Sequence, residues 1–352
     1  MAKEHTDYMK LCLKLAKKGE FLTSPNPLVG SILVDNANII SQGYHKHYSA
    51  AHAERACLDN IKEYTISKHA VLYVNLEPCS HFGKTPPCAD YLIERGLKHV
   101  VIGCMDSSKK VNGQGIEKLK SAGVEVSENV LKDECRFLNR RFFTFHEKKR
   151  PYIVLKWAET KDGFIADREN KSKWISSEQS RELVHLYRAE EAAILIGYNT
   201  AKYDNPFLTA RPASLDEKKY NQPTRVFLDR NLSLPQTIHL YNNHAKSIII
   251  NQIKQGFEGV HEFVKIDFSA PVIEQIIEIL HTRNINSLLV EGGTKLLQSF
   301  IERELYDEAR VFISPKKFES GVRAPKIGKT ASSVTMITED TLKIYTNHDF
   351  VL

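Results

Sequence analysis

The sequence predicts an α/β protein made of two successive domains, and three observations support this prediction. The chain has 352 residues, which is long for a single hydrophobic core. Segments with strand and helix patterns alternate along both halves, as in layered α/β folds. The alternation is interrupted once, by a charged run that ends at Pro151.

The elements of the first half follow from hydrophobic spacing. Apolar residues at helical intervals, with Gly19 as a stop, predict a helix over residues 5–18. Short apolar runs predict strands over residues 28–34, 70–76 and 100–104. Between and after them, helices are expected over residues 52–64, 88–95 and 115–121.

The second half repeats the alternation with different motifs. Residues 146–151, a charged run into a proline, suit a linker, so we expect domains of residues 1–146 and 147–352. Because the halves share no motif, the chain suggests a fusion and not a duplication. Strands are expected over residues 152–158, 192–197, 224–229, 247–251 and 287–290, and helices over 177–189, 271–282 and 294–304.

Composition limits the classes of function. Charged residues are 26% of the chain and the net charge is +6, spread along the sequence, so nucleic acid is not an expected partner. All six cysteines precede residue 136, and no secretory signal opens the sequence. No apolar run reaches the roughly 18 residues of a membrane span. We therefore expect a cytoplasmic protein with reduced thiols and no membrane partner.

Three short motifs predict a catalytic zinc site. His52-Ala53-Glu54 is followed by Pro78-Cys79 and then by Pro87-Cys88. One histidine and two cysteines can hold zinc and leave a fourth position for water, whose pKa the metal lowers to about 7. The order matches the signature of zinc deaminases, although eight residues separate the cysteines here in place of two.

These motifs assign roles. His52, Cys79 and Cys88 are the expected ligands, and Glu54 is the expected catalytic carrier of protons between water and the leaving amine. Residues two apart on a helix point about 200° apart, so His52 and Glu54 can share one metal only at a helix end. A structural zinc is the alternative, but no fourth Cys or His recurs at a standard spacing.

Longer motifs occur in order along both halves of the chain. The first half contains residues 24–30 (SPNPLVG) and 77–88 (EPCSHFGKTPPC). The second half contains Arg150-Pro151-Tyr152, Lys156-Trp157-Ala158, Asp162-Gly163, Trp174-Ile175-Ser176, Leu186-Tyr187-Arg188-Ala189, Asp204-Asn205-Pro206, Leu208-Thr209 and Glu291-Gly292-Gly293. Together these motifs resemble one known family, the bifunctional deaminase/reductases of riboflavin biosynthesis, with the first set similar to its deaminase half and the second to its reductase half. The resemblance covers nearly the whole chain.

The resemblance implies fold, reaction and cofactors. It implies a cytidine-deaminase-like three-layer α/β/α domain followed by a dihydrofolate-reductase-like α/β domain. The first would use Zn²⁺ to deaminate a diamino-ribosylamino-pyrimidinone 5′-phosphate. The second would use NADPH to reduce the ribosyl chain to ribityl phosphate. A homo-oligomer, dimer or tetramer, is also expected.

The resemblance also implies which residues form the two sites, because positions of this sequence match the family's motifs. Asn26 and His45 match contacts to the pyrimidine, and Lys84 matches a phosphate contact, although without the resemblance Lys84 reads equally well as a solvent-facing lysine. The motif positions that would contact NADPH are Ala158, Trp174, Thr200, Asp204, Gly292 and Gly293. Those that would contact the reductase substrate are Ser172, Arg188, Leu208, Arg211 and Glu291.

The chemistry of these residues is consistent with the roles that the resemblance implies. The two glycines follow a strand and open a helix, where backbone N–H groups can approach a phosphate. Arg188 and Arg211 suit the ribose phosphate because guanidinium pairs with phosphate bidentately. Asp204 is a candidate acid for the reduction, or simply a turn residue before Pro206.

Departures from the family pattern leave a second hypothesis open. Residues 106–110 (DSSKK), 159–161 (ETK) and Arg230 differ from the usual residues. A working deaminase joined to a reductase-like domain that has lost NADPH binding is therefore an alternative. A third hypothesis, a nucleic-acid-editing deaminase, predicts a basic stripe with interleaved aromatics. Only residues 140–143 (RRFF) approach that pattern, and they read better as a domain seam.

Overall fold

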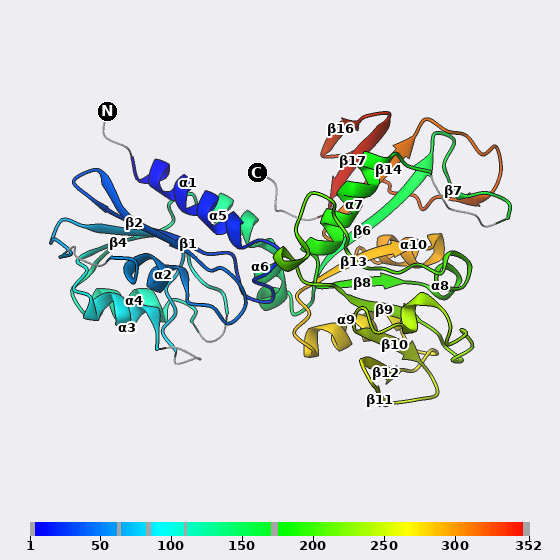
Figure 1. Ribbon diagram of the computed structural model, residues 1–352, viewed down its shortest axis with the longest axis horizontal. Coiled ribbons are helices and arrows are strands. Elements are labelled where there is room, and N and C mark those ends of the chain that lie inside the picture. The colour runs from blue at the N-terminus through cyan, green and yellow to red at the C-terminus, as the bar shows by residue number, and fades with distance from the viewer. Residues whose placement is uncertain (1–3, 62–64, 82–85, 109–110, 170–174, 348–352) are drawn as a thin grey trace. The chain divides into compact units, whose positions relative to one another are not determined.

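The protein is described from a computed structural model, which covers residues 4–61, 65–81, 86–108, 111–169 and 175–347 (Figure 1). The chain divides into two compact units, of which the first ends at Lys149 and the second begins at Arg150. None of the helices in the described ranges is long and apolar enough to cross a membrane.

The first unit is built on a five-stranded sheet with the order β2-β1-β3-β4-β5. β1 is antiparallel to β2 and β3, whereas β3, β4 and β5 are parallel. The parallel strands need crossover helices, and α3 (Cys88–Glu94) and α4 (Gln114–Ser121) make these crossovers on one face of the sheet. The strands are β1 (Gly30–Asp35), β2 (Asn38–Tyr44), β3 (Val71–Leu76), β4 (His99–Cys104) and β5 (Glu125–Ser127).

Helices cover both faces of this sheet. α1 (His5–Ala16) and α5 (Lys132–Leu138) lie on one face, and α2 (Ala53–Leu58), α3 (Cys88–Glu94) and α4 (Gln114–Ser121) on the other (Figure 1). Leu58, Leu92 and Leu119 of the latter group pack into one buried cluster with strand residues. The three-layer α/β/α prediction is confirmed. A 3₁₀ turn, η1 (Lys17–Gly19), follows α1, and α6 (Arg140–Glu147) ends the unit.

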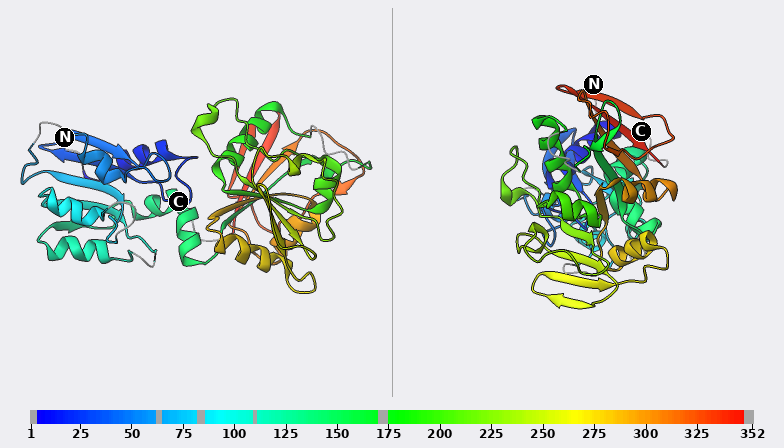
Figure 2. Two further views of the ribbon diagram at one scale, coloured as in Figure 1. Left: turned by 60° about the horizontal axis from the view of Figure 1, so that its bottom comes forward. Right: turned by 90° about the vertical axis from the view of Figure 1, so that its right-hand side faces the viewer.

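The second unit is built on a twisted ten-stranded sheet (Figure 2). Its order is β11-β12-β10-β9-β8-β13-β6-β14-β17-β16, with a parallel centre and antiparallel pairs at both edges. The strands are β6 (Tyr152–Thr160), β8 (Ala193–Ile196), β9 (Thr224–Leu228), β10 (Ser247–Asn251), β11 (Gly256–Glu258), β12 (His261–Lys265), β13 (Ser287–Gly292), β14 (Glu308–Ser314), β16 (Ser333–Ile337) and β17 (Asp340–Thr346).

Helices of the second unit also lie on both faces of its sheet. They are α7 (Glu178–Glu190), α8 (Tyr198–Asp204), α9 (Val272–Thr282) and α10 (Thr294–Glu302), with 3₁₀ turns η2 (Glu217–Lys219) and η3 (His239–Tyr241). β7 (Phe164–Ala166) and β15 (Val322–Arg323) form a separate small sheet.

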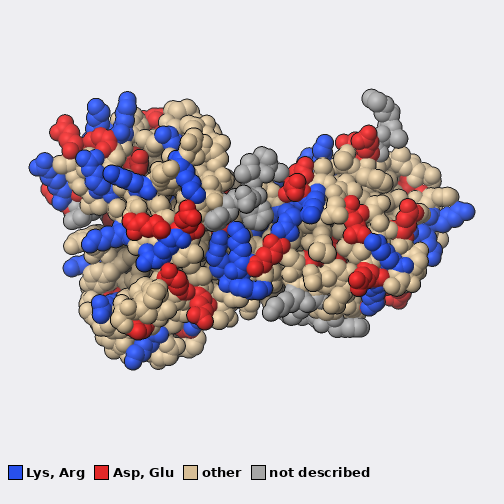
Figure 3. All heavy atoms as spheres, turned by 180° about the vertical axis from the view of Figure 1, so that it is seen from behind, with Lys and Arg blue, Asp and Glu red and all other residues tan. Residues whose placement is uncertain are grey.

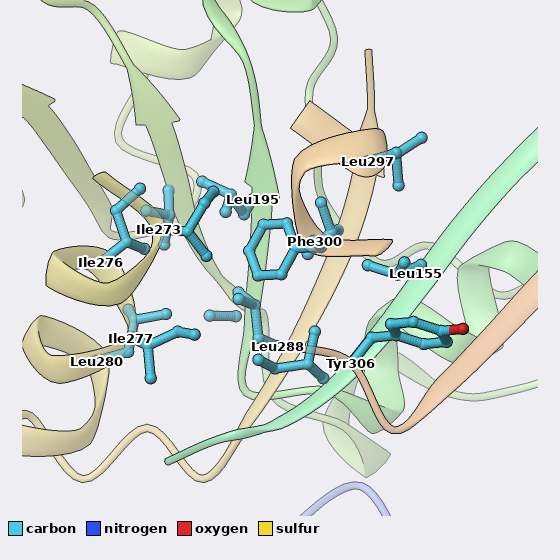
Figure 4. Close-up of a cluster of buried hydrophobic side chains, with 14 of the residues drawn as sticks. Leu155, Leu195, Ile273, Ile276, Ile277, Leu280, Leu288, Leu297, Phe300 and Tyr306 are labelled. Atoms are coloured by element: carbon cyan, nitrogen blue, oxygen red, sulfur yellow. The ribbon is translucent and has the colours of Figure 1, made fainter. Parts of the chain in front are cut away.

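The alternation along β6 decides which face holds the site. Leu155 of β6 points into a cluster with Leu195, Leu288, Ile276 and Phe300, from β8, β13, α9 and α10 (Figure 4). Tyr152 and Val154 point to the opposite face, against residues of α8 and its following loop. Because side chains alternate along a strand, Lys156 shares the face of Val154.

Most predicted elements are present with shifted ends. The expected helix over residues 52–64 is shorter, because α2 already ends at Leu58 and residues 62–64 lie outside the described part. The expected linker begins inside α6, which runs to Glu147. The helices and strands that were not predicted are α5, α6, α8, β2, β5, β7, β11, β12 and all strands after β13.

Candidate active sites

The structure brings the three predicted zinc ligands together in the first unit. Nδ1 of His52 lies 3.5 Å from Sγ of Cys79 and 3.3 Å from Sγ of Cys88, and all three atoms lie within 4.8 Å of one another. Zinc bonds of about 2.0 Å to nitrogen and 2.3 Å to sulfur at tetrahedral angles place such atoms about 3.6 Å apart. The donor set therefore fits a zinc ion.

Local structure fixes these ligands. His52 is the N-cap residue of α2, Cys88 is the first residue of α3, and Cys79 follows β3. The Cys88 backbone N–H donates to Sγ of Cys79 over 3.3 Å. Hydrogen bonding from the Cys88 thiol, together with the nearby His52, lowers the pKa of Cys79, and the same contact raises the pKa of Cys88. One thiolate is therefore favoured before any metal binds.

Glu54 lies in the first turn of α2, beside His52. Its side chain is buried, and burial raises the pKa of its carboxyl group. Glu54 does not belong to the ligand group of His52, Cys79 and Cys88 among the described residues. The helix end thus presents a ligand and a separate carboxyl group to one site, as the two-residue spacing requires.

The two predicted pyrimidine contacts, Asn26 and His45, touch each other. Nδ1 of His45 lies 3.1 Å from the Ala51 carbonyl oxygen, so this nitrogen donates. Nε2 therefore accepts from the Asn26 amide nitrogen, 3.1 Å away. The His45 ring also lies edge-on to the His52 ring, with centroids 5.7 Å apart. This pairing leaves the Asn26 amide oxygen free of His45 and places both side chains beside the metal ligands.

Glu77, which the sequence reasoning did not single out, holds the loop that carries Cys79. Its buried carboxylate accepts backbone N–H groups of Asp106, Gly113, Gly115 and Ile116 over 2.9–3.2 Å. Residues 106–110 differ from the family pattern, and Asp106 at their start is therefore bonded to the loop that carries Cys79. Lys109 and Lys110 lie outside the described residues, as does Lys84.

The second unit contains a cavity of about 290 Å³. It lies at the carboxyl ends of β6, β8 and β13, where open α/β sheets bind ligands. Of the predicted reductase residues, Ala158, Arg188, Thr200, Asp204, Leu208, Glu291, Gly292 and Gly293 line it. Arg211 lies beside this set, and its backbone N–H donates to the lining residue His185. Ser172 and Trp174 lie outside the described residues.

A buried charge cluster forms one wall of the cavity. Arg188 donates to Glu291 through Nε and Nη2, over 2.6 and 2.8 Å, and Lys156 Nζ lies 4.0 Å from the same carboxylate. Burial alone would raise the pKa of Glu291, but Arg188 and Lys156 lower it to about 2. Burial lowers the pKa of Lys156. Arg188 is thus already paired, in contrast to the free phosphate anchor that the sequence suggested.

The sequence motifs include Lys156 but assign it no role, yet it lines the cavity. Its neighbours in β6, Leu155 and Trp157, are buried in the core. A lysine in the middle of an apolar strand was the available signal, because a buried ammonium group needs a partner.

Two glycines open the cavity toward α10. Gly292 has φ of 134°, which favours glycine, and a Cβ on Gly293 would lie 3.4 Å from the Thr200 hydroxyl. Gly293 is the N-cap of α10 and has no side-chain cap. A phosphate-bearing cofactor therefore fits this position, because backbone can approach it closely at a positive helix end.

The departures that favoured a degenerate reductase do not face the cavity. Glu159 accepts from Nε1 of Trp157 over 2.8 Å, and Arg230 donates to Gln252 over 2.8 Å. Neither belongs to the lining. The sequence departures at these positions therefore give no reason to expect a defective cavity.

The segment that suggested nucleic-acid binding is part of the core. Phe142 and Phe143 are buried, and Arg136 stacks on the Phe143 ring. Buried rings cannot stack on bases. On the face shown in Figure 3, basic and acidic side chains are interspersed over much of the surface.

Comparisons with known proteins agree with both units. Residues 151–335 match the model of the RibD C-terminal domain, and residues 2–104 match the zinc-binding region of cytidine and deoxycytidylate deaminases. The riboflavin biosynthesis protein RibD of Aquifex aeolicus is 39% identical over 329 residues, which cover 92% of this chain and 90% of the relative.

Solved structures extend the likeness to the whole chain. The diaminohydroxyphosphoribosylaminopyrimidine deaminase/5-amino-6-(5-phosphoribosylamino)uracil reductase of Thermotoga maritima has a TM-score of 0.87 at 35% identity, covering 97% of each chain. RibD of Acinetobacter baumannii has a TM-score of 0.88 at 28% identity, covering 97% of this chain and 98% of its own.

Proposed function

Because this chain belongs to the RibD family of riboflavin biosynthesis proteins, we propose that its two units perform consecutive steps on one phosphorylated pyrimidine. It is a bifunctional enzyme, a zinc-dependent deaminase joined to an NADPH-dependent reductase. The first step hydrolyses the ring amine of 2,5-diamino-6-ribosylamino-4(3H)-pyrimidinone 5′-phosphate. The second reduces the ribosyl chain of the product to ribityl phosphate. The observation that carries the proposal is that the first unit brings His52, Cys79 and Cys88 together, and that the cavity of the second unit is lined by most of the predicted reductase residues that the structure describes.

In the deaminase step, His52, Cys79 and Cys88 hold the zinc ion. When bound, zinc lowers the pKa of water and so supplies a nucleophile at neutral pH. Glu54 takes a proton as water adds to the ring carbon and returns one to the departing ammonia, a role suited to a buried carboxyl group with a raised pKa. Asn26 and His45 orient the pyrimidine, and Lys84 contacts the phosphate.

In the reductase step, NADPH supplies the hydride. Ala158, Trp174, Thr200, Asp204, Gly292 and Gly293 bind this cofactor, and the glycines let its phosphates approach the start of α10. Ser172, Arg188, Leu208, Arg211 and Glu291 form the substrate side. Hydride addition to the first ribosyl carbon requires a proton at the oxygen that this carbon releases. Lys156 is the better candidate donor than Asp204, because it lines the cavity and burial lowers the pKa of its ammonium group, which eases release of the proton.

The remaining parts of the proposal concern organisation. We assign the deaminase to residues 1–146, the reductase to residues 147–352, and the enzyme to the cytoplasm. We also expect a dimer or tetramer. The uncharged edge strand β16 supports self-association, since Val334 and Met336 are 60% and 61% exposed there. Light scattering should report an oligomer that Val334→Lys weakens, whereas a monomeric wild type would contradict this expectation.

The proposed function is tested by following both steps separately. Ammonia release and NADPH oxidation are measured with the purified chain and the diaminopyrimidine phosphate. Glu54→Gln should retain about one zinc per chain and lose ammonia release, because the ligands remain and the proton carrier is gone. It should still oxidise NADPH when the deaminated product is supplied. Full ammonia release by Glu54→Gln, or no NADPH oxidation by the wild type, would refute the assignment.

A further inference from the structure

One side chain in the reductase cavity has no role in the steps described above. His185 lies on α7, which presents Arg181, Val184, His185 and Arg188 to the cavity at helical spacing. Glu291 and Lys156 form the neighbouring wall. His185 is therefore within the space where the substrate must bind.

Backbone hydrogen bonding fixes the tautomer of His185. Its Nδ1 accepts the Arg211 backbone N–H over 3.2 Å. A neutral imidazole has one donor and one acceptor nitrogen, so the proton must be on Nε2. Within the described part of the chain, this Nε2–H has no hydrogen-bond partner. A half-buried N–H group that faces a cavity and has no partner among the described residues is placed to donate to a ligand.

The surrounding charges keep the ring neutral. Burial, together with the guanidinium groups of Arg188 and Arg211, lowers the pKa of His185 to about 4, against the smaller opposite effects of Glu291 and Glu182. His185 is thus a directional neutral donor at neutral pH and not a third cation. A proton-transfer role near pH 7 would require a pKa near 7, so donation is the role that remains.

The charges of the cavity identify the group that the donor would meet. Arg188 forms two hydrogen bonds with Glu291 and Lys156 Nζ lies 4.0 Å from the same carboxylate, so one negative charge faces these two cations. Arg211 has no carboxylate partner among the described residues, and its Nη1 donates to the Thr209 hydroxyl. The end of the cavity at Arg211 and His185 therefore carries a positive charge with no carboxylate beside it. An anionic oxygen is attracted there, and guanidinium groups pair readily with phosphate.

We propose that His185 is a substrate-binding residue of the reductase, and that its Nε2–H donates a hydrogen bond to an oxygen of the substrate's 5′-phosphate group. The inference deepens the proposed reductase function and rests on it. At this end of the cavity, Arg211 supplies a positive charge and His185 supplies an oriented hydrogen-bond donor. The same histidine holds the Arg211 backbone through its other nitrogen, so the two phosphate contacts are positioned together.

Two substitutions separate the two nitrogens of His185. The Oδ1 of His185→Asn can take the place of Nδ1 and keep the bond from the Arg211 N–H, but it offers no donor at the Nε2 position. The amide nitrogen of His185→Gln reaches the Nε2 position and restores the donor. The first variant therefore removes the proposed contact alone, and the second is its matched control.

Steady-state kinetics of NADPH oxidation with the deaminated substrate give the decisive comparison. His185→Asn should raise KM roughly tenfold, the effect of losing one hydrogen bond to a charged group, with kcat within about twofold of wild type. His185→Gln should stay within about threefold of the wild-type KM. An unchanged KM in His185→Asn, or equal increases in both variants, would overturn the proposal.

Inhibition by substrate fragments tests which group is contacted. Ribose 5-phosphate should inhibit the wild-type reductase competitively, and His185→Asn should weaken that inhibition roughly tenfold. Inhibition by ribose, which lacks phosphate, should be equal in the two proteins, and a loss confined to ribose would contradict the phosphate assignment. If neither variant folds, ¹⁵N NMR of the wild-type histidines decides: ribose 5-phosphate should shift the Nε2–H resonance of His185, and a static resonance overturns the proposal.

Failure of this inference can be told from failure of the proposed function. A wild-type protein that does not oxidise NADPH with the deaminated substrate would refute the reductase function itself. A wild-type protein that does so, with His185→Asn behaving identically, would refute only the role of His185.

Discussion

Replacing Glu291 by Gln removes the carboxylate that compensates Arg188 and Lys156 in the reductase cavity. Arg188 cannot lose its proton, so the substitution leaves a buried guanidinium group without its counterion. The fall in the pKa of Glu291 from 4.5 to about 2 corresponds to about 3 kcal/mol of stabilisation at neutral pH. We expect Glu291→Gln to lower the free energy of unfolding of the second unit by that amount.

The effect of pH has a definite sign. A carboxyl group whose pKa is lower in the folded state stabilises the protein above its unfolded pKa, here 4.5. This stabilisation is lost as the pH falls through that value toward about 2. At pH 3 it should be on the order of 1 kcal/mol, so the difference between wild type and Glu291→Gln should shrink to roughly half or less.

Urea denaturation followed by tryptophan fluorescence measures this difference. Both tryptophans, Trp157 and Trp174, belong to the second unit, so the signal reports on that unit alone. Glu262→Gln is the matched control, because Glu262 also forms a bidentate pair, with Arg283, but the pair is partly exposed. The control should lose under about 1 kcal/mol. Equal losses in both variants, or a Glu291→Gln loss that does not change with pH, would refute the reasoning.

Four further outcomes follow from the structure. Leu288→Ala should lower the free energy of unfolding of the second unit by about 3 kcal/mol in the same urea assay, because Leu288 is fully buried among α9 and α10 (Figure 4); a loss under about 1 kcal/mol would contradict the packing. Cys79→Ser should bind under about one tenth of the wild-type zinc by metal analysis, and full occupancy would exclude it as a ligand. Glu77→Gln should reduce ammonia release more than NADPH oxidation, since it loosens the zinc loop only; an equal reduction of both activities would count against this role. Lys156→Met should lower kcat for NADPH oxidation at least roughly a hundredfold without altering ammonia release, and normal turnover would exclude Lys156 as the proton donor.

The sequence predicted that His52, Cys79 and Cys88 would cluster because short motifs mark each of them. His52 and Glu54 are two residues apart at a helix start, and each cysteine follows a proline, so each residue could be recognised locally although the fold brings them together from positions 27 and 36 residues apart. The sequence assigned Asn26 and His45 to the same substrate, but it did not predict that they contact each other. Their hydrogen bond depends on how β1 and β2 return the chain, which no local pattern specifies.

The reductase half was predicted less completely because tertiary contacts replace the usual patterns. β14 contains Glu308 and Arg310, charged residues that disguise a buried strand. These two side chains lie on one face of the strand and pair with each other, with Arg310 donating to Glu308 over 2.6 Å and to Glu190 of α7 over 3.2 Å. β2 was missed for the opposite reason, since nearly all of its residues are only partly buried or exposed and they lack an apolar alternation. Arg188 was assigned to phosphate because its buried partner, Glu291, lies 103 residues away.

Complementation between two variants tests most directly the claim that one chain holds two separate active sites acting in sequence. Glu54→Gln and Lys156→Met are each incubated with the diaminopyrimidine phosphate and NADPH, alone and mixed. Neither variant alone should form the ribityl product, since each lacks one step. The mixture should form it, because Lys156→Met releases the deaminated intermediate that Glu54→Gln reduces. A mixture that accumulates deaminated intermediate without oxidising NADPH, or a single variant that completes both steps, would contradict the account.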